Sequence, residues 1–160
     1  EIGQAGEIQF IHGRLNIGEA MSPPLIRKVK QYINPAQTVI LDAPPGTSCP
    51  MVSAVRGSDF CLLVSEPTPF GLNDLELAVE TVKTLGVPCG VVINRSDIGD
   101  QAVKSYCQNE NIPVLMEISF ERQIAELYSR GIPLVEARPE WCKRFQEMFS
   151  AIQKTVPAVS

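Results

Sequence analysis

The sequence has few of the residues from which metal centres and disulfide-bonded proteins are built. It contains one histidine, one tryptophan and five cysteines among 160 residues, and no pair of cysteines forms a Cys-x-x-Cys motif. This spacing provides no local zinc or iron–sulfur ligand pattern and no evident disulfide framework. No apolar run is long enough to cross a bilayer, and no signal peptide is evident. We therefore expect a cytoplasmic protein without a membrane partner.

An excess of positive charge is also missing. The formal net charge is −4, with 44% hydrophobic and 20% charged residues. A chain with net negative charge is a poor match for a phosphate backbone, so we expect no nucleic-acid partner. The length and composition suit one globular domain, over residues 1–160, with a full hydrophobic core.

A phosphate loop of the Gly-x-x-x-x-Gly-Lys-Ser/Thr type is absent from the chain. In nucleotide hydrolases that loop and its lysine supply most of the electrostatics that bind the phosphates. We therefore expect this chain, taken alone, to be catalytically silent toward nucleoside triphosphates.

What the sequence does contain is an alternation of short apolar runs with helical stretches. The expected strands are Ile8–His12, Thr38–Asp42, Phe60–Ser65, Cys89–Asn94 and Pro113–Ile118. The expected helices are Pro23–Ile33, Met51–Gly57, Asn73–Leu85, Asp100–Asn109, Gln123–Arg130 and Glu140–Val156, the last with an apolar face that should dock on the sheet. Residues 1–7 show little pattern. Strict alternation predicts an α/β fold, an open doubly wound, mainly parallel sheet with helices on both faces.

One predicted strand ends in an acidic residue followed by a tight turn. Asp42 follows Val39, Ile40 and Leu41, a run that suits a strand buried on both faces, and Pro-Pro-Gly at 44–46 comes next. A carboxylate at the carboxyl end of such a strand can hold hydrated Mg²⁺ near phosphates. Gly46 has no Cβ, so its N–H can approach a terminal phosphate closely. The alternative is that Asp42 only caps the turn and the prolines only redirect the chain.

Two further strand ends carry candidate binding residues. Asn94 ends an apolar run, and its amide can both donate to and accept from the edge of a purine base. Its alternative role is that of a turn former. The Ser119–Glu121 loop, with Phe120 at its centre, leads from the last predicted strand into a helix and could wrap a base.

The cysteines and the single histidine have mainly structural interpretations. Cys61 and Cys89 fall inside predicted strands, where a thiol is usually a small core group. Cys49 follows the Pro-Pro-Gly turn, so either packing or a redox or ligand role is open to it. His12 lies in a predicted strand, where a structural or surface role is favoured over a catalytic one.

Together, in this order, these segments resemble the MinD/Mrp branch of the deviant Walker-A P-loop ATPases, which includes ParA and the nitrogenase iron protein. Residues 42–47 (Asp-Ala-Pro-Pro-Gly-Thr) resemble the Walker-B and switch II segment, and 65–69 (Ser-Glu-Pro-Thr-Pro) the strand end and turn that follow. Residues 92–95 (Val-Ile-Asn-Arg) resemble the adenine-recognition strand end, and 112–131 the late strand and helix. The family loop usually reads Ile-Pro-x-Asp, whereas Ser119 and Glu121 stand here in place of the proline and aspartate.

The resemblance implies a role for each candidate residue. Asp42 would contact the water shell of Mg²⁺, Gly46 would sense the γ-phosphate of ATP, Asn94 would read adenine, and the Ser119–Glu121 loop would close over the base. It also implies that the complete protein is an ATPase that dimerises with ATP. In that case this chain is the carboxyl-terminal part of a MinD-like ATPase domain, and the phosphate loop lies upstream.

Within the superfamily, the sequence is most similar to MinD-like ATPases that carry an inserted ferredoxin domain. Residues 10–15 (Phe-Ile-His-Gly-Arg-Leu), with 17–19 and 22, resemble the segment that re-enters the ATPase fold after the insertion. The resemblance therefore implies upstream iron–sulfur clusters in the full-length protein.

Two other classes of function stay open at the level of the sequence. One is a self-contained, non-catalytic α/β binding module, flavodoxin-like or receiver-like, in which Asp42 is a binding or phosphorylation site. A receiver would need an acidic pair on an earlier strand and a late lysine, which are not evident. The other is a scaffold or metal-handling protein that uses Cys49 together with a partner chain.

Overall fold

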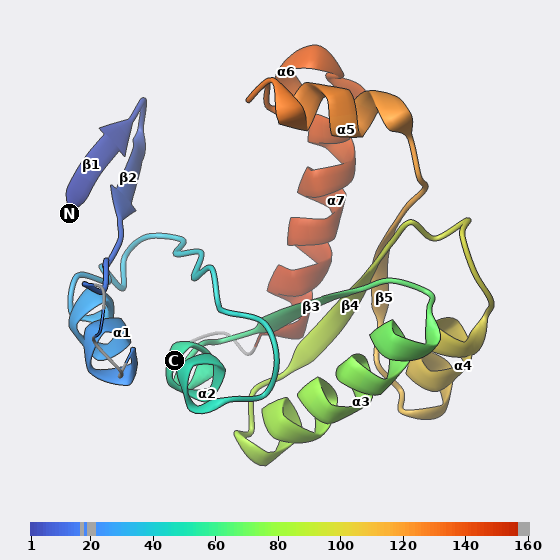
Figure 1. The fold of residues 1–160 in the computed structure, drawn as a ribbon, viewed down its shortest axis with the longest axis horizontal. Helices are drawn as coiled ribbons and strands as arrows, with labels where there is room; N and C mark the ends of the chain where they lie inside the picture. Colours follow the sequence, from blue (N-terminus) through green and yellow to red (C-terminus); the bar gives the residue numbers. More distant parts are fainter. Residues whose placement is uncertain (17, 19–21, 157–160) are drawn as a thin grey trace. The chain divides into compact units, whose positions relative to one another are not determined.

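The chain divides into two compact units. The structure is a computed structural model that describes residues 1–16, 18 and 22–156, and its two units are Glu1–Gly57 and Ser58–Ser160 (Figure 1). We call them the N-terminal unit and the C-terminal unit and describe each by itself.

A parallel sheet forms the centre of the C-terminal unit. It contains β3 (Cys61–Ser65), β4 (Cys89–Asn94) and β5 (Val114–Ile118), in the order β3-β4-β5. Cys61 pairs with Cys89, and Val92 pairs with Met116 after a register shift between Val91 and Val92. These three strands and their parallel direction confirm the prediction within one or two residues at each end.

Helices alternate with these strands, as the sequence pattern predicts. They are α3 (Pro69–Thr84), α4 (Ala102–Asn109), α5 (Arg122–Ser129), the short α6 (Leu134–Ala137) and α7 (Glu140–Thr155). Helix α3 begins at Pro69, earlier than predicted, because the Thr68 hydroxyl accepts a hydrogen bond of 3.0 Å from the Gly71 N–H. A threonine cap followed by proline is a strong helix start. Helix α6 was not predicted.

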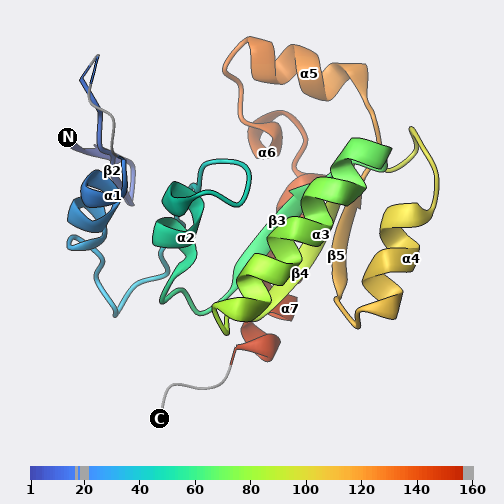
Figure 2. The same cartoon turned by 60° about the horizontal axis from the view of Figure 1, so that its bottom comes forward.

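The core of this unit lies on both faces of β4. Val91 and Ile93 pack against α3 and α4, in a cluster of buried residues completed by Leu75, Val79, Val103, Cys107 and Ile112. Val92 points to the other face, where it packs with Met116 and Trp141. The side chains of a strand alternate between faces, so a strand with consecutive apolar residues must be covered on both faces. Figures 1 and 2 show α3 and α4 on one side of the sheet and α7 on the other.

The N-terminal unit contains a hairpin and two helices. Strands β1 (Ile2–Ala5) and β2 (Ile8–Ile11) pair antiparallel, and α1 (Pro23–Lys30) and α2 (Cys49–Val55) follow. Gly6 begins the short hairpin turn with φ +60°, a conformation that glycine adopts without strain. The sequence predicts no element in residues 1–7. That prediction is wrong, because Ile2–Ala5 form a strand.

The predicted strand Thr38–Asp42 is also wrong. This segment is irregular, with Val39 42% and Ile40 90% exposed, so it is not buried on both faces. A strand exists only where a neighbouring strand accepts and donates its backbone hydrogen bonds, and β-propensity alone does not supply that neighbour. The described residues therefore show a mixed α/β fold with a helix-flanked parallel sheet, a separate antiparallel hairpin and no closed barrel.

Candidate functional site

The six predicted site residues are divided between the two units. Asp42 and Gly46 belong to the N-terminal unit, whereas Asn94 and the Ser119–Glu121 loop belong to the C-terminal unit. In the C-terminal unit, Figure 1 shows the three parallel strands ending at one edge of the sheet. Asn94 and the loop both lie at this carboxyl edge, which is where open α/β sheets bind ligands.

Asn94 is the last residue of β4 and is half-buried. It pairs with Ile118, the last residue of β5, so the two strands end at the same level. The next residue, Arg95, has φ 51°, which turns the chain sharply directly after the asparagine. Among the described residues, the Asn94 amide has no hydrogen-bond partner. Its donor and its acceptor are therefore both available to a ligand.

The Ser119–Glu121 loop is tied to the loop that follows Asn94. The Phe120 N–H donates to Asp97 Oδ1 at 2.6 Å, and the Ser96 N–H donates to the Ile118 carbonyl at 2.9 Å. The Arg95 guanidinium lies over the Phe120 ring, 5.6 Å from its centroid. Phe120 remains 48% exposed, so it offers an aromatic surface close to the end of β4.

Three charged residues that are not among the predicted site residues, Glu66, Arg95 and Arg138, also lie at this edge or contact its loop. Arg95 Nε lies 3.5 Å from Glu66 Oε1, which follows β3. Arg138 donates through Nη1 to the Glu121 carboxylate and through Nε, at 2.7 Å, to Glu140. The same carboxyl-edge rule that selected Asn94 could have found Glu66 and Arg95. Nothing in the local sequence pairs Arg138 with Glu121, because the helices α5 and α6 lie between them.

The backbone at this edge is tightly packed. The buried Ser65 hydroxyl donates to the Gly71 carbonyl at 2.9 Å. A Cβ on Gly71 would lie 2.3 Å from the Glu66 carbonyl oxygen, and one on Gly99 would lie 1.9 Å from that of Pro67. Only glycine fits at either position, so the loops after β3 and β4 are held in one arrangement.

Hydrogen bonding sets the charge states at the outer end of the site. The Glu140 and Glu121 hydrogen bonds raise the pKa of Arg138, so its guanidinium stays charged. The hydrogen bond from Arg138 lowers the pKa of Glu140. By contrast, burial, with a smaller effect of Cys89, raises the pKa of the Cys61 thiol to about 11. Cys61 and Cys89 are both partly buried, so the predicted core role holds in part.

In the N-terminal unit, Asp42 and Gly46 both lie on an irregular, exposed segment. No described residue holds the Asp42 carboxylate in an ion pair or hydrogen bond. Gly46 has φ +83°, a left-handed conformation that favours glycine. Cys49 is exposed and is the first residue of α2. The structure thus leaves both predicted phosphate-side residues accessible.

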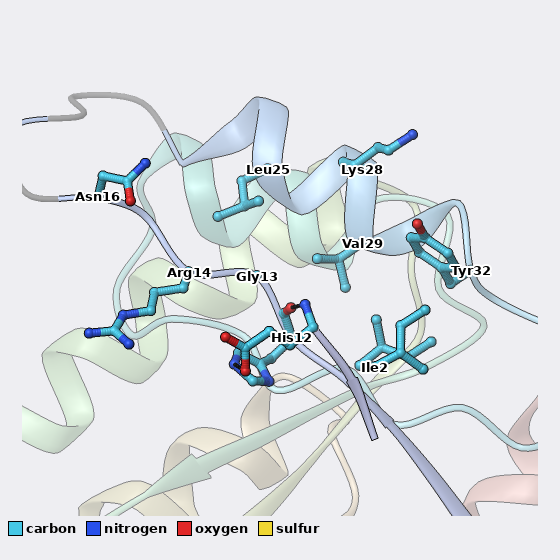
Figure 3. Close-up of a pocket in the computed structure, with 11 residues that line it drawn as sticks. Ile2, His12, Gly13, Arg14, Asn16, Leu25, Lys28, Val29 and Tyr32 are labelled. Atoms are coloured by element: carbon cyan, nitrogen blue, oxygen red, sulfur yellow. Dashed lines mark hydrogen bonds and ion pairs between the residues drawn. The ribbon is translucent and has the colours of Figure 1, made fainter. Parts of the chain in front are cut away.

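A separate hollow of about 400 Å³ lies in the N-terminal unit, between the hairpin and α1. Figure 3 shows Ile2, Val29 and Tyr32 grouped on one side of it, and Lys28 pointing away. His12 lines it, with Nε2 3.4 Å from a Glu1 carboxylate oxygen. The hollow contains none of the six predicted site residues.

Two wider features of the described residues bear on cofactors and membranes. They contain no group of three or more His, Cys, Asp or Glu side chains arranged to hold a metal ion. Within the same residues, the helices are too short or too polar to traverse a bilayer.

The chain is similar to two proteins of Methanocaldococcus jannaschii, both described as uncharacterized. It is 32% identical to MJ0579 over 137 residues, which cover 81% of this chain and 48% of that protein. It is 26% identical to MJ0578 over 151 residues, which cover 92% of this chain and 51% of that protein. The chain therefore spans about half the length of the curated relatives it matches. No known family profile matches it.

Proposed function

We propose that this chain is the switch II and adenine-binding part of a MinD-like ATPase. In this proposal the parallel sheet is part of an open, doubly wound P-loop NTPase fold whose phosphate loop lies elsewhere in a longer protein. ATP binding and hydrolysis by that protein would be coupled to a partner or to an iron–sulfur-linked step, with ATP-dependent pairing of two copies.

The observation that carries the proposal is the carboxyl edge of β4 and β5. Asn94 and the Ser119–Glu121 loop were selected from the sequence separately, and the hydrogen bond from Phe120 N–H to Asp97 Oδ1 joins their loops at 2.6 Å. The edge offers an unpaired amide for a base edge and an exposed aromatic ring for a base face. These are the two kinds of contact by which proteins recognise a purine.

Asp42 fits a magnesium ion of the nucleotide-bound kind. Mg²⁺ beside ATP is usually held by one or two carboxylates together with phosphates and several waters, rather than by an all-protein cage. A single accessible carboxylate, without a surrounding metal-ligating group in the described residues, agrees with that mode. When bound, the ion would neutralise phosphate charge, and Asp42 would orient its water shell.

An iron–sulfur cluster does not fit the described residues. Clusters of this kind are commonly held by four cysteine thiolates, and no such group of metal ligands is present in the described part of the chain. Any cluster in the full-length protein is therefore proposed to sit outside this stretch.

The test is the nucleotide preference of the full-length protein with Asn94→Ala. If Asn94 reads adenine, ATP affinity should fall by about 1–3 kcal/mol, because the base edge loses a donor and an acceptor. GTP affinity should change little, since guanine presents the reverse pattern. Calorimetry with both nucleotides measures the difference.

Asn109→Ala provides a matched control, because Asn109 is an exposed residue at the end of α4. It should leave both affinities unchanged. Equal losses of ATP and GTP in Asn94→Ala, together with a lower melting temperature, would contradict the proposal and favour a turn-forming asparagine in a non-catalytic module.

A further inference from the structure

Arg138 lies between two carboxylates from different parts of the C-terminal unit. Its Nη1 donates to Glu121, and its Nε donates to Glu140 Oε1 at 2.7 Å. The guanidinium has a planar set of donors, so one side chain can hold two carboxylates in fixed directions. The Arg138 side chain is 29% exposed and its contact with Glu121 is partly buried, whereas its contact with Glu140 is exposed.

On one side, Arg138 fixes the end of the loop assigned to the base. Glu121 is both the last residue of the Ser119–Glu121 loop and the cap residue of α5. Its carbonyl accepts the first backbone hydrogen bond of the helix, from the Ile124 N–H at 3.0 Å. Holding the Glu121 side chain therefore fixes the direction in which the chain leaves β5.

On the other side, Arg138 lies next to α7, which is anchored by one buried side chain, that of Trp141. The Arg138 carbonyl accepts from the Trp141 N–H at 3.0 Å, and Glu140 is the first residue of α7. Trp141 is 1% exposed and packs with Val92 and Met116 beneath the sheet. Because Arg138 is bonded to this closely packed cluster, it can hold the Glu121 side chain in a fixed position.

The loop is held from its opposite side by the residues after β4. The Phe120 N–H donates to Asp97 Oδ1 at 2.6 Å, and Arg95 lies over the Phe120 ring. The loop is therefore contacted from two directions, by Arg95 and Asp97 in the segment after β4 and by Arg138 between α6 and α7. An attachment from β4 alone would leave Glu121 free to swing.

We propose that Arg138 is a positioning residue that holds the Ser119–Glu121 loop in its base-binding arrangement. The expected consequence, tighter ATP binding, rests on the proposed function. The claim that Arg138 holds the loop does not depend on it. Arg138 touches no nucleotide in this proposal. It lowers the cost of binding by keeping the loop ordered before the base arrives.

The claim that Arg138 holds the loop is tested on the 160-residue chain by amide hydrogen exchange. Arg138→Gln should speed exchange at Phe120 and Ile124, whose N–H groups bond to Asp97 Oδ1 and to the Glu121 carbonyl, by about tenfold, which corresponds to about 1.4 kcal/mol of local opening. Amides of β4 should keep their protection. The matched control is Arg122→Gln, which removes an 88% exposed arginine paired with Glu126 on the outer side of α5. Unchanged exchange at the loop, or uniform acceleration throughout the unit, would overturn the inference.

The expected effect on ATP binding is tested on the full-length protein by steady-state ATP hydrolysis. Arg138→Gln should raise KM for ATP about tenfold and leave kcat within about twofold, because a positioning role acts on binding rather than on chemistry. Arg138→Lys should recover only part of the loss, since lysine cannot hold both carboxylates in the same fixed geometry. A fall in kcat with unchanged KM would contradict the positioning role.

The exchange test and the hydrolysis test can fail independently of each other. A wild-type protein that binds no ATP would refute the proposed function while the exchange result still decides whether Arg138 holds the loop. If Arg138→Gln does not fold, Glu121→Gln breaks the same contact from the other side and should give the same local exchange pattern.

Discussion

The central strand of the C-terminal unit and the helices over it bury a core of apolar side chains, whereas the hairpin and the 38–42 segment of the N-terminal unit leave theirs exposed. Trp141, Ile93 and Val91 are almost completely buried in the first, while Ile40 is 90% and Ile8 71% exposed in the second. The difference follows from neighbours, because β4 has a strand on each side and helices on both faces. The predicted strand at 38–42 is equally apolar but has no strand beside it in its own unit.

This contrast separates structural from functional effects. The proposed base-reading residues lie on the well-packed unit, and the proposed magnesium residue lies on the exposed one. Substitutions in the core of the C-terminal unit should therefore act on stability, and substitutions near Asp42 should act on chemistry alone. The following predictions sharpen this comparison or break it.

The largest expected effect is on stability, from Trp141→Ala. Removing a fully buried aromatic side chain from a core typically costs about 3–5 kcal/mol. Denaturant unfolding of the 160-residue chain measures it. In the N-terminal unit, Ile40→Ala should stay within about 0.5 kcal/mol, because the side chain is already in water. A large loss from Ile40→Ala would show that this run is buried and would break the comparison.

Next in size is the effect of Asp42→Asn on ATP hydrolysis by the full-length protein. Turnover should fall by roughly a hundredfold, about 2.7 kcal/mol, because a metal-orienting charge is lost at the transition state. The melting temperature should not change, since the carboxylate is exposed. Unaltered hydrolysis would remove Asp42 from the mechanism.

A smaller effect is expected at Lys30, the main polar link between the helices of the N-terminal unit. Its Nζ donates to the carbonyls of Ala54 and Arg56, both at 2.7 Å, at the end of α2. Burial lowers the pKa of this ammonium. Because water still reaches the Lys30 ammonium, Lys30→Met should lower the free energy of unfolding by only about 1 kcal/mol. The loss should appear as faster amide exchange in α2 but not in α3. Lys28→Met on the same helix is the control. Equal effects of the two substitutions would refute the role of Lys30 in binding the carbonyls at the end of α2.

The smallest predicted effect is a pH dependence at Glu140. Its pKa is lowered by the Arg138 hydrogen bond, so the folded state favours the ionised carboxylate. The resulting stabilisation is complete above the pKa of glutamate in the unfolded state, about 4.3. It disappears as the pH falls through the lower pKa of Glu140 in the folded state. The stability difference between the wild type and Glu140→Gln should therefore be constant from neutral pH to about 5 and vanish in acid. A difference that persists at the lowest pH would contradict this link.

Much of the C-terminal unit could be predicted because its signals are local. The consecutive apolar residues Val91, Val92 and Ile93 indicate a strand covered on both faces, and the apolar face of α7 indicates docking on the sheet. The docking is confirmed by the packing of Trp141 against Val92 and Met116. The start of α3 was placed too late, although Thr68 and Pro69 form a recognisable cap.

The remainder depends on tertiary context that the sequence does not display. The segment 38–42 has the composition of a strand, yet a strand needs hydrogen-bonded neighbours that only the folded sheet supplies. Asn94 and the Ser119–Glu121 loop were selected because strand ends can be predicted. Arg138 is not evident in the sequence because its contact with Glu121, 17 residues earlier, forms only on folding, and the neighbouring Glu140 alone gives no sign of it.

The central claim, that Asn94 reads adenine, is tested most directly through its side-chain amide. In full-length protein labelled with ¹⁵N-asparagine, the NH₂ resonance of Asn94, assigned by its loss in Asn94→Ala, should shift on addition of ATP. The shift should be much smaller with GTP at equal saturation, because guanine does not match the donor and acceptor pattern of the amide. An Asn94 resonance that stays in place while ATP is bound would contradict the account.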